Sequence, residues 1–255
     1  MSVVLMYHAL HPDSNVSEVD LEDQPYAVSE STFKEHIAVL KDYKVGLLSD
    51  DPSAEQPDVI VTFDDGHISN HAIALPLLES AGIPAYFFVT TDFIRSREFF
   101  CRPEHLKDFT TAGMVVGSHG VSHEFLADLP ADAAKHELVH SRNVLQEWLD
   151  EDITTLSFPG GRYNKGTMAV AREAGYKQIF DSTFDTVSAT DLAQNNALAR
   201  VAIRRTTSLG DFENMVAYDK PFYRRVQRTQ RIKQTVKKVL GNRVYHGLYK
   251  SISAH

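Results

Sequence analysis

The chain has 255 residues, of which 43% are hydrophobic and 24% charged, as is ordinary for a globular protein. This composition excludes a disordered chain, and no run approaches the roughly 20 apolar residues that a membrane-spanning helix needs. The single cysteine, Cys101, excludes an internal disulfide framework. The net charge is −8.

That charge is unevenly distributed. Residues 220–255 contain ten Lys and Arg and no acidic residue, so this tail carries a charge of +10. The remaining 16 basic and 34 acidic residues give residues 1–219 a charge of −18. In this tail Ile232, Val236 and Val239 share a helical face with basic neighbours, which predicts docking on an anionic membrane surface. Packing of the tail on the acidic body is the alternative. Nothing in the pattern predicts a nucleic-acid partner.

The N-terminal sequence MSVVLMYHAL lacks the basic region of a secretory signal, and its apolar run stops at His8. We therefore expect a cytoplasmic protein, with a peripheral membrane location if the tail docks as predicted.

Short β-branched and aromatic runs alternate along the chain with helix-like segments. Each of seven runs predicts a strand. These strands are Val3–Tyr7, Val59–Phe63, Ala85–Thr90, Met114–Gly117, Thr155–Phe158, Gln178–Ser182 and Leu198–Ile203. Helical periodicity connects most of them, for example over 31–40, 103–112 and 128–149. The alternation predicts βα units around a parallel sheet or barrel over 1–219, followed by the tail 220–255.

Polar residues follow four of the predicted strands directly. They are Tyr7-His8, Asp64-Asp65, Ser118-His119 and Pro159-Gly160. Because the carboxyl ends of parallel strands lie at one edge, where sites are usually built, we expect these four clusters to converge.

Two of these clusters could bind a metal ion. In TFDDG (Thr62–Gly66), adjacent carboxylates point in different directions, so that one can bind a metal while the other faces a substrate; a solvated turn is the alternative. In SHGVSH (Ser118–His123), the four-residue spacing of His119 and His123 predicts two imidazoles on one side of a helical turn. Two His and one Asp would leave positions open for water on a zinc-type ion, but the same set describes mononuclear iron oxygenases.

The third motif is the glycine-rich segment FPGGRYN (Phe158–Asn164). Glycines let a backbone approach a substrate closely, and a free N–H in such a loop can stabilise an oxyanion. The alternative is an ordinary tight loop.

In this order, and each after a strand, the TFDDG, SHGVSH and FPGGRYN motifs resemble the polysaccharide deacetylase family, the NodB-homology carbohydrate esterases. The segments Pro84–Val89 and Gly113–Gly117 add to the resemblance, which covers about Val3 to Phe212. The opening Leu5–His8 (LMYH) is similar to a circularly permuted branch that includes poly-N-acetylglucosamine deacetylases.

The resemblance implies a distorted (β/α)7 barrel and a metal-dependent hydrolase that removes N-acetyl groups from an amino-sugar glycan. Asp64 would be the catalytic base, and Asp65, His119 and His123 would hold a divalent metal. Zn²⁺ is the expected ion, with Ni²⁺, Co²⁺ and Fe²⁺ open. The N–H of Gly160 would stabilise the tetrahedral oxyanion.

Three departures from the family pattern concern residues around these motifs. Ser157 stands where the family usually has an arginine that orients the base, and Arg162 is a candidate to replace that arginine. The usual Asp-Trp region is missing, and the only tryptophan, Trp148, reads as a helix packing residue. The usual late Leu-x-His, which supplies the catalytic acid, is also missing.

In the permuted branch the acid moves to the first strand, which makes His8 the candidate general acid. His11 and His67 are rivals, and His8 could instead merely fill the barrel mouth.

Three other functions stay open from the sequence alone. A hydrolase of small cyclic amides or imides would keep the metal set but should have a narrow, closed pocket. A non-catalytic glycan-binding relic is disfavoured by Asp64, which is not a predicted ligand. An iron oxygenase fits the ligands but not the motif order.

Overall fold

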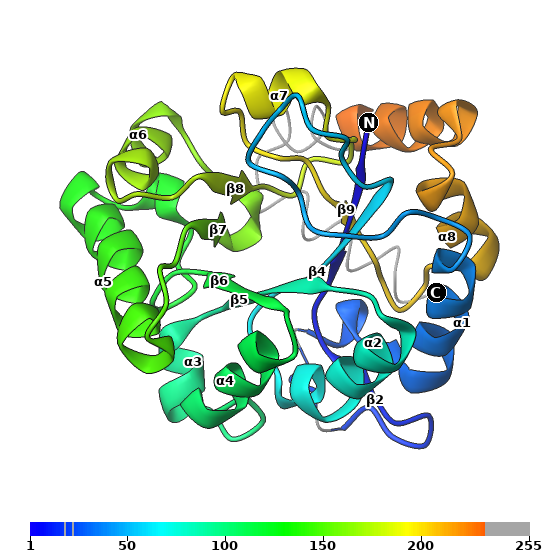
Figure 1. Cartoon of the computed structure of the whole chain (residues 1–255), viewed down its shortest axis with the longest axis horizontal. Coiled ribbons are helices and arrows are strands. Elements are labelled where there is room, and N and C mark those ends of the chain that lie inside the picture. The colour runs from blue at the N-terminus through cyan, green and yellow to red at the C-terminus, as the bar shows by residue number, and fades with distance from the viewer. Residues whose placement is uncertain (18, 22, 233–255) are drawn as a thin grey trace.

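The computed structural model describes residues 1–17, 19–21 and 23–232. A curled parallel sheet of seven strands lies at its centre, in the order β8-β7-β6-β5-β4-β1-β9, and helices surround it (Figure 1). The strands are β1 (Val3–Tyr7), β4 (Val59–Phe63), β5 (Ala85–Val89), β6 (Val115–Ser118), β7 (Thr155–Ser157), β8 (Gln178–Phe180) and β9 (Val201–Ala202). The predicted distorted (β/α)7 barrel is confirmed, and each strand falls within or beside a predicted run.

The central strands are buried on both faces, which explains their continuous apolar sequences. All five residues of β1 and of β4 are buried. The register pairs Val3 with Val59 and Tyr7 with Phe63, so the two strands end at the same level. His8 and Asp64, which follow these strands directly, therefore lie at the same edge of the sheet.

The two outer edges of the sheet approach each other through residues 198–203. Leu198 forms a parallel bridge to Phe180 of β8, whereas Val201 pairs with Leu5 of β1. The predicted strand over this segment is thus divided between both edges, and it curls the sheet into a barrel.

Helices cover the outside of the curled sheet. They are α1 (Glu30–Leu40), α2 (Leu75–Ala81), α3 (Thr91–Ser96), α4 (Pro103–Thr111), α5 (Ala131–Leu149), α6 (Lys165–Glu173), α7 (Ala189–Ala193) and α8 (Leu209–Val216). Two short strands, β2 (Leu10–His11) and β3 (Val28–Ser29), pair in parallel at the two ends of the loop between them. This pair was not predicted.

The first part of the basic tail packs on the barrel. Residues 220–232 are helical, Phe222 and Tyr223 are buried, and the Gln227 side chain donates to the Phe184 carbonyl at 3.1 Å. Of the predicted amphipathic face, Ile232 is exposed.

Val236 and Val239, the rest of that face, lie outside the described residues, so membrane docking stays a prediction. None of the helices over 1–17, 19–21 and 23–232 is long and apolar enough to cross a membrane.

Candidate metal centre and active site

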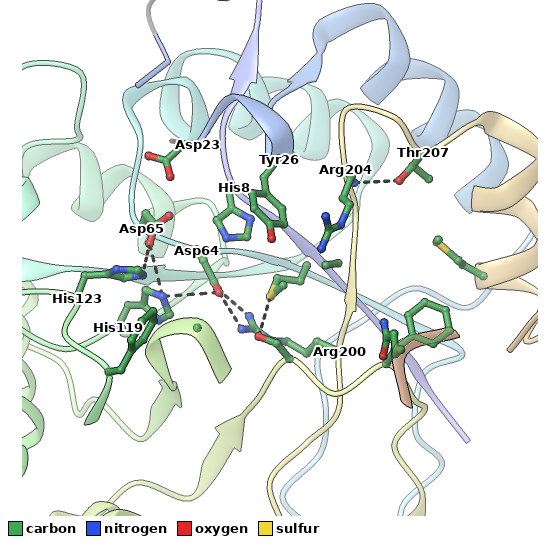
Figure 2. Close-up of a pocket in the computed structure, with 18 of the residues that line it drawn as sticks. His8, Asp23, Tyr26, Asp64, Asp65, His119, His123, Arg200, Arg204 and Thr207 are labelled. Carbon is green, nitrogen blue, oxygen red and sulfur yellow. Dashed lines mark hydrogen bonds and ion pairs between the residues drawn. The ribbon is translucent and has the colours of Figure 1, made fainter. Parts of the chain in front are cut away.

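The predicted clusters converge at the carboxyl edge of the barrel. His8, Asp64, Asp65, His119 and Gly160 line one cavity of about 460 Å³ (Figure 2). Further lining comes from β1, from the loop before α1, from the loop after β6, from segments around β8, β9 and α8, and from the helical residues 220–232. They include Met6, Asp23, Tyr26, His123, Phe125, Ser182, Phe184, Arg200, Arg204, Thr207, Met215, Val226 and Gln230.

Three ligand-type side chains meet at one end of this cavity. The Asp65 Oδ1 atom lies 3.3 Å from His123 Nε2 and 3.5 Å from His119 Nε2. The three ligand atoms are all within 4.8 Å of one another. Asp65 Oδ1 is buried without a hydrogen-bond partner in the described part of the chain, as expected of an atom whose partner is an ion. Two imidazoles and one carboxylate therefore fit a divalent cation of the zinc type.

The protonation states of His119 and Asp65 are compatible with binding of a divalent cation. His119 Nδ1 lies 2.8 Å from the Ser157 carbonyl, so this nitrogen carries the proton and donates it, leaving the Nε2 lone pair directed at Asp65. Burial lowers the pKa of His119 to about 3, which keeps the ring neutral. Burial raises the pKa of Asp65 to about 7, an effect that a bound cation would oppose.

Residues 119–123 form an irregular loop, so the predicted helical turn is wrong. The two imidazoles meet because the backbone of Gly120 (φ 80°) and His123 (φ 67°) reverses direction. The carboxylate of Glu137, on α5, fixes the loop by accepting hydrogen bonds from the N–H groups of Val121 (2.7 Å) and Ser122 (3.0 Å). The ligand spacing thus depends on a buried carboxylate far along the chain.

A backbone kink separates the two adjacent carboxylates of TFDDG. Asp65 has φ 72° and Gly66 has φ 85°, both in the left-handed region. A Cβ at Gly66 would lie 2.9 Å from side-chain carbons of Val89 and Ile94, so only glycine fits. The kink directs Asp65 to both imidazoles and Asp64 to Arg200, with His119 within 3.8 Å of Asp64 as well (Figure 2).

Asp64 is held by Arg200, a residue that the sequence reasoning missed. The Arg200 Nη1 and Nη2 atoms lie 2.7 and 2.8 Å from the two Asp64 oxygens, and both side chains are almost fully buried. The same guanidinium donates to Ser157 Oγ at 2.7 Å, to Thr62 Oγ1 at 3.2 Å and to the Asp181 carbonyl at 2.8 Å. Burial alone would raise the pKa of Asp64, but Arg200 and His119 hold that pKa well below its usual range.

Arg162 does not contact Asp64, so the prediction that it replaces the motif arginine is wrong. Its guanidinium lies 3.3 Å from Asp128 and stacks 4.2 Å from the Phe125 ring centroid, and 44% of the side chain is exposed. The loop directs it outward. The sequence did contain a signal for Arg200: a charged residue inside an apolar strand must find a buried partner.

The glycine-rich loop reaches the cavity through Gly160, whereas Pro159 is buried beneath it. Gly160 has φ 60°, and a Cβ there would come within 2.5 Å of the Phe125 ring. This position therefore requires glycine, and its backbone lies where a substrate would pass.

His8 lies between Asp64 and Tyr26 at the cavity wall (Figure 2). Its Nδ1 atom is buried with no hydrogen-bond partner over the described ranges, and its ring centroid is 4.8 Å from that of Tyr26. Of the two rivals, His11 is bound to the Pro12 carbonyl at 2.8 Å and does not line the cavity. His67 lies 2.8 Å from Ser69 Oγ and lines only a much smaller cavity beside it.

Comparisons with known proteins show the family and the fold of the chain. The family model described as polysaccharide deacetylase matches residues 51–179. The Bacillus subtilis protein YxkH is 26% identical over 183 residues, which are 68% of this chain and 62% of YxkH. The chain thus spans less than two thirds of that relative.

Two solved structures are similar in fold. The Streptococcus pyogenes deacetylase PplD is 23% identical with a TM-score of 0.71, covering 84% of this chain and 97% of its own. IcaB from Ammonifex degensii is also 23% identical, with a TM-score of 0.70 over 84% and 96% of the two chains. Since the family model matches half of the sequence and the predicted motifs lie within the site, the chain belongs to the polysaccharide deacetylase family.

Proposed function

We propose that the protein is a metal-dependent deacetylase that removes N-acetyl groups from an amino-sugar glycan. The proposal depends on one observation: a set of metal-ligand side chains and a separate carboxylate that can act as a base lie together at the carboxyl edge of the barrel. Asp65, His119 and His123 form a ligand set, and beside it Asp64 is an ionised carboxylate that is not needed as a ligand. A glycan-binding relic would have no use for such a carboxylate, whereas hydrolysis requires a base.

Each side chain has a distinct role in this proposal. A divalent cation held by the three ligands would polarise the acetamide carbonyl and make water more acidic. Asp64, oriented by Arg200, accepts the proton of the attacking water. The N–H of Gly160, at the cavity wall, is the proposed donor to the oxyanion. His119 lies 3.8 Å from Asp64 and keeps the base next to the ligand set.

His8 is the proposed general acid. An amine cannot leave the tetrahedral intermediate unprotonated, and His8 lies beside Asp64 at the cavity wall (Figure 2). Replacement of His8 by Ala should retain bound metal and lose amide turnover. An activated acetyl ester should suffer less, because its leaving group needs little protonation. Equal losses on both substrates would count against this role.

The shape of the site favours a glycan over a small cyclic amide. A second cavity of about 490 Å³ shares Asp23, Asp65 and His123 with the first and continues past Phe93 and Arg97. Two of the three ligands thus line both of two neighbouring hollows, which suits a chain that runs past the metal. A narrow, closed pocket would have suited a cyclic imide.

The test combines metal analysis with acetate release from N-acetylated glucosamine oligomers of β-1,4 and β-1,6 linkage. We expect one divalent ion per chain and release of one acetate per cleaved amide, without consumption of oxygen. Metal binding without acetate release from any oligomer would overturn the proposal. Oxygen consumption with a ferrous ion would instead support the oxygenase that the ligand set alone leaves open.

A further inference from the structure

Arg204 lines the cavity, and none of the acidic side chains that the structure describes pairs with it. Three other arginines in or beside the two cavities are paired: Arg200 with Asp64 at 2.7 Å, Arg162 with Asp128 at 3.3 Å and Arg97 with Asp20 at 3.5 Å. Within residues 1–17, 19–21 and 23–232, no acidic side chain lies within 4.0 Å of the Arg204 guanidinium, although the body of the protein is strongly acidic. A positive charge at the cavity is therefore left for a ligand.

Arg204 is exposed, and its guanidinium is positioned against an aromatic ring. Its Cζ lies 4.9 Å from the centroid of the Tyr26 ring. The backbone of Arg204 exchanges two hydrogen bonds with Thr207, each of 2.9 Å, and Arg205 N–H donates to the Pro25 carbonyl at 2.9 Å. This anchoring reduces the entropy that ordering the side chain on a ligand would cost.

Its place relative to the reaction is defined by Tyr26. One neighbour of that ring is the His8 ring, at 4.8 Å between centroids, and the other is Arg204. In Figure 2, His8, Tyr26 and Arg204 form a row that leads away from Asp65 and His123. The proposed acid His8 faces the departing nitrogen, so Arg204 lies on the side of the sugar and not of the acetyl group.

The other residues that line the cavity near Arg204 are apolar or uncharged, so Arg204 provides the charge that an anionic group on a sugar would bind. Apolar side chains of Phe184, Met215 and Val226 lie among the lining residues, with Gln230 as a polar neighbour. The charge of Asp64 is already neutralised by Arg200, and Asp23 lies at the end of the ligand set (Figure 2). A guanidinium binds carboxylate and phosphate through two parallel hydrogen bonds, a geometry that sugar hydroxyls do not match.

We infer that the substrate is an anionic glycan, in which a carboxylate or phosphate on the N-acetylated sugar or its neighbour binds Arg204. The inference rests on the proposed deacetylase function and narrows its substrate class. Arg204 is then a specificity residue, since it contacts the substrate away from the bond that is cleaved.

The test compares three probes, two disaccharides and one sugar phosphate. N,N′-diacetylchitobiose is neutral, the disaccharide of N-acetylglucosamine and N-acetylmuramic acid carries a carboxylate, and N-acetylglucosamine 1-phosphate carries a phosphate. We expect the wild type to have a higher kcat/KM on at least one anionic probe, and the preferred probe distinguishes the two sources of charge. Added salt should raise KM for that probe but not for the neutral one.

Arg204→Gln should lower kcat/KM on the preferred anionic probe by roughly 10- to 100-fold, the equivalent of one charge-assisted hydrogen-bond pair. The change should lie mainly in KM, and turnover of the neutral probe and of an activated acetyl ester should be nearly unchanged. Arg204→Lys should recover part of the loss. The matched control is Arg205→Gln, because Arg205 is exposed like Arg204 but does not line the cavity.

Equal losses on the neutral and anionic probes would overturn the inference, as would a wild type without anionic preference. If no probe releases acetate, the proposed function fails, and equilibrium binding of the same probes decides the inference separately. Weaker binding of the anionic probe to Arg204→Gln than to the wild type would then support the anion site, and equal binding would reject it.

Discussion

Replacing Arg200 is the most demanding test of how this site is built. Arg200→Met removes a fully buried guanidinium that makes two contacts with Asp64 and three with other groups. The Asp64 carboxylate would remain buried without its counter-charge. Breaking a buried pair in this way costs about 3–5 kcal/mol.

That cost is a large fraction of the roughly 5–15 kcal/mol by which domains are stable. Removing both charges should cost less, because no uncompensated ion is left behind. We therefore expect the double variant Asp64→Asn/Arg200→Met to regain roughly half of the loss seen in Arg200→Met. Arg162→Met is the matched control: its partner Asp128 is exposed, so its loss should be within about 1 kcal/mol.

The assay is denaturant unfolding of the wild type and of each variant. Turnover is then measured for the variants that fold. Arg200→Lys keeps the charge without the two-pronged contact, and we expect it to fold and to lose about 10²-fold in kcat through misplacement of Asp64. The reasoning is refuted if Arg200→Met is no less stable than Arg162→Met. A double variant less stable than the single one would refute it as well.

Three further predictions concern the metal, the base and a buried imidazole. His119→Ala should lose most bound metal, whereas His136→Ala, in a histidine pair outside the site, should retain it by elemental analysis. Asp64→Asn should keep the metal and lose about 10²–10⁴-fold in kcat; near-normal turnover would make Asp64 structural. Burial lowers the pKa of His36 from 6.5 to about 4, so the unfolded chain takes up this proton first as pH falls. Stability should therefore drop by about 3 kcal/mol between pH 6.5 and 4, and this drop should be absent from unfolding curves of His36→Gln.

The sequence predicted the barrel and the place of the candidate ligands because both depend on local signals, whereas the resemblance to the family supplied the role of each ligand. Continuous apolar runs such as Val59–Phe63 identify parallel strands, and a polar residue directly after a strand must lie at the carboxyl edge. These two rules place Asp64, Asp65 and His119 without any knowledge of tertiary contacts. The polar residues that follow β1, β4 and β6 were therefore predictable, whereas most of the other residues that line the cavity were not.

Two features were not predictable in the same way. The approach of His123 to His119 depends on a positive φ and on Glu137, whose carboxylate reaches the loop from α5. The strand prediction over Leu198–Ile203 depends on apolar residues and gives no partner for Arg200, the one charged residue inside the segment. Periodicity identifies elements, but it does not say which buried charges meet across a barrel.

The place of Arg200 follows from the small side chain at residue 157. Ser157 occupies the position at which the family usually has an arginine, and its Oγ accepts from Arg200 Nη2 at 2.7 Å. The guanidinium from the β9 side thus fills the space beside Ser157 and reaches the same carboxylate. One carboxylate can neutralise only one guanidinium, and a second buried cation at residue 157 would stay unpaired at a cost of several kcal/mol. An arginine at 157 and one at 200 should therefore exclude each other, which makes the missing motif residue and the buried strand arginine two aspects of one arrangement.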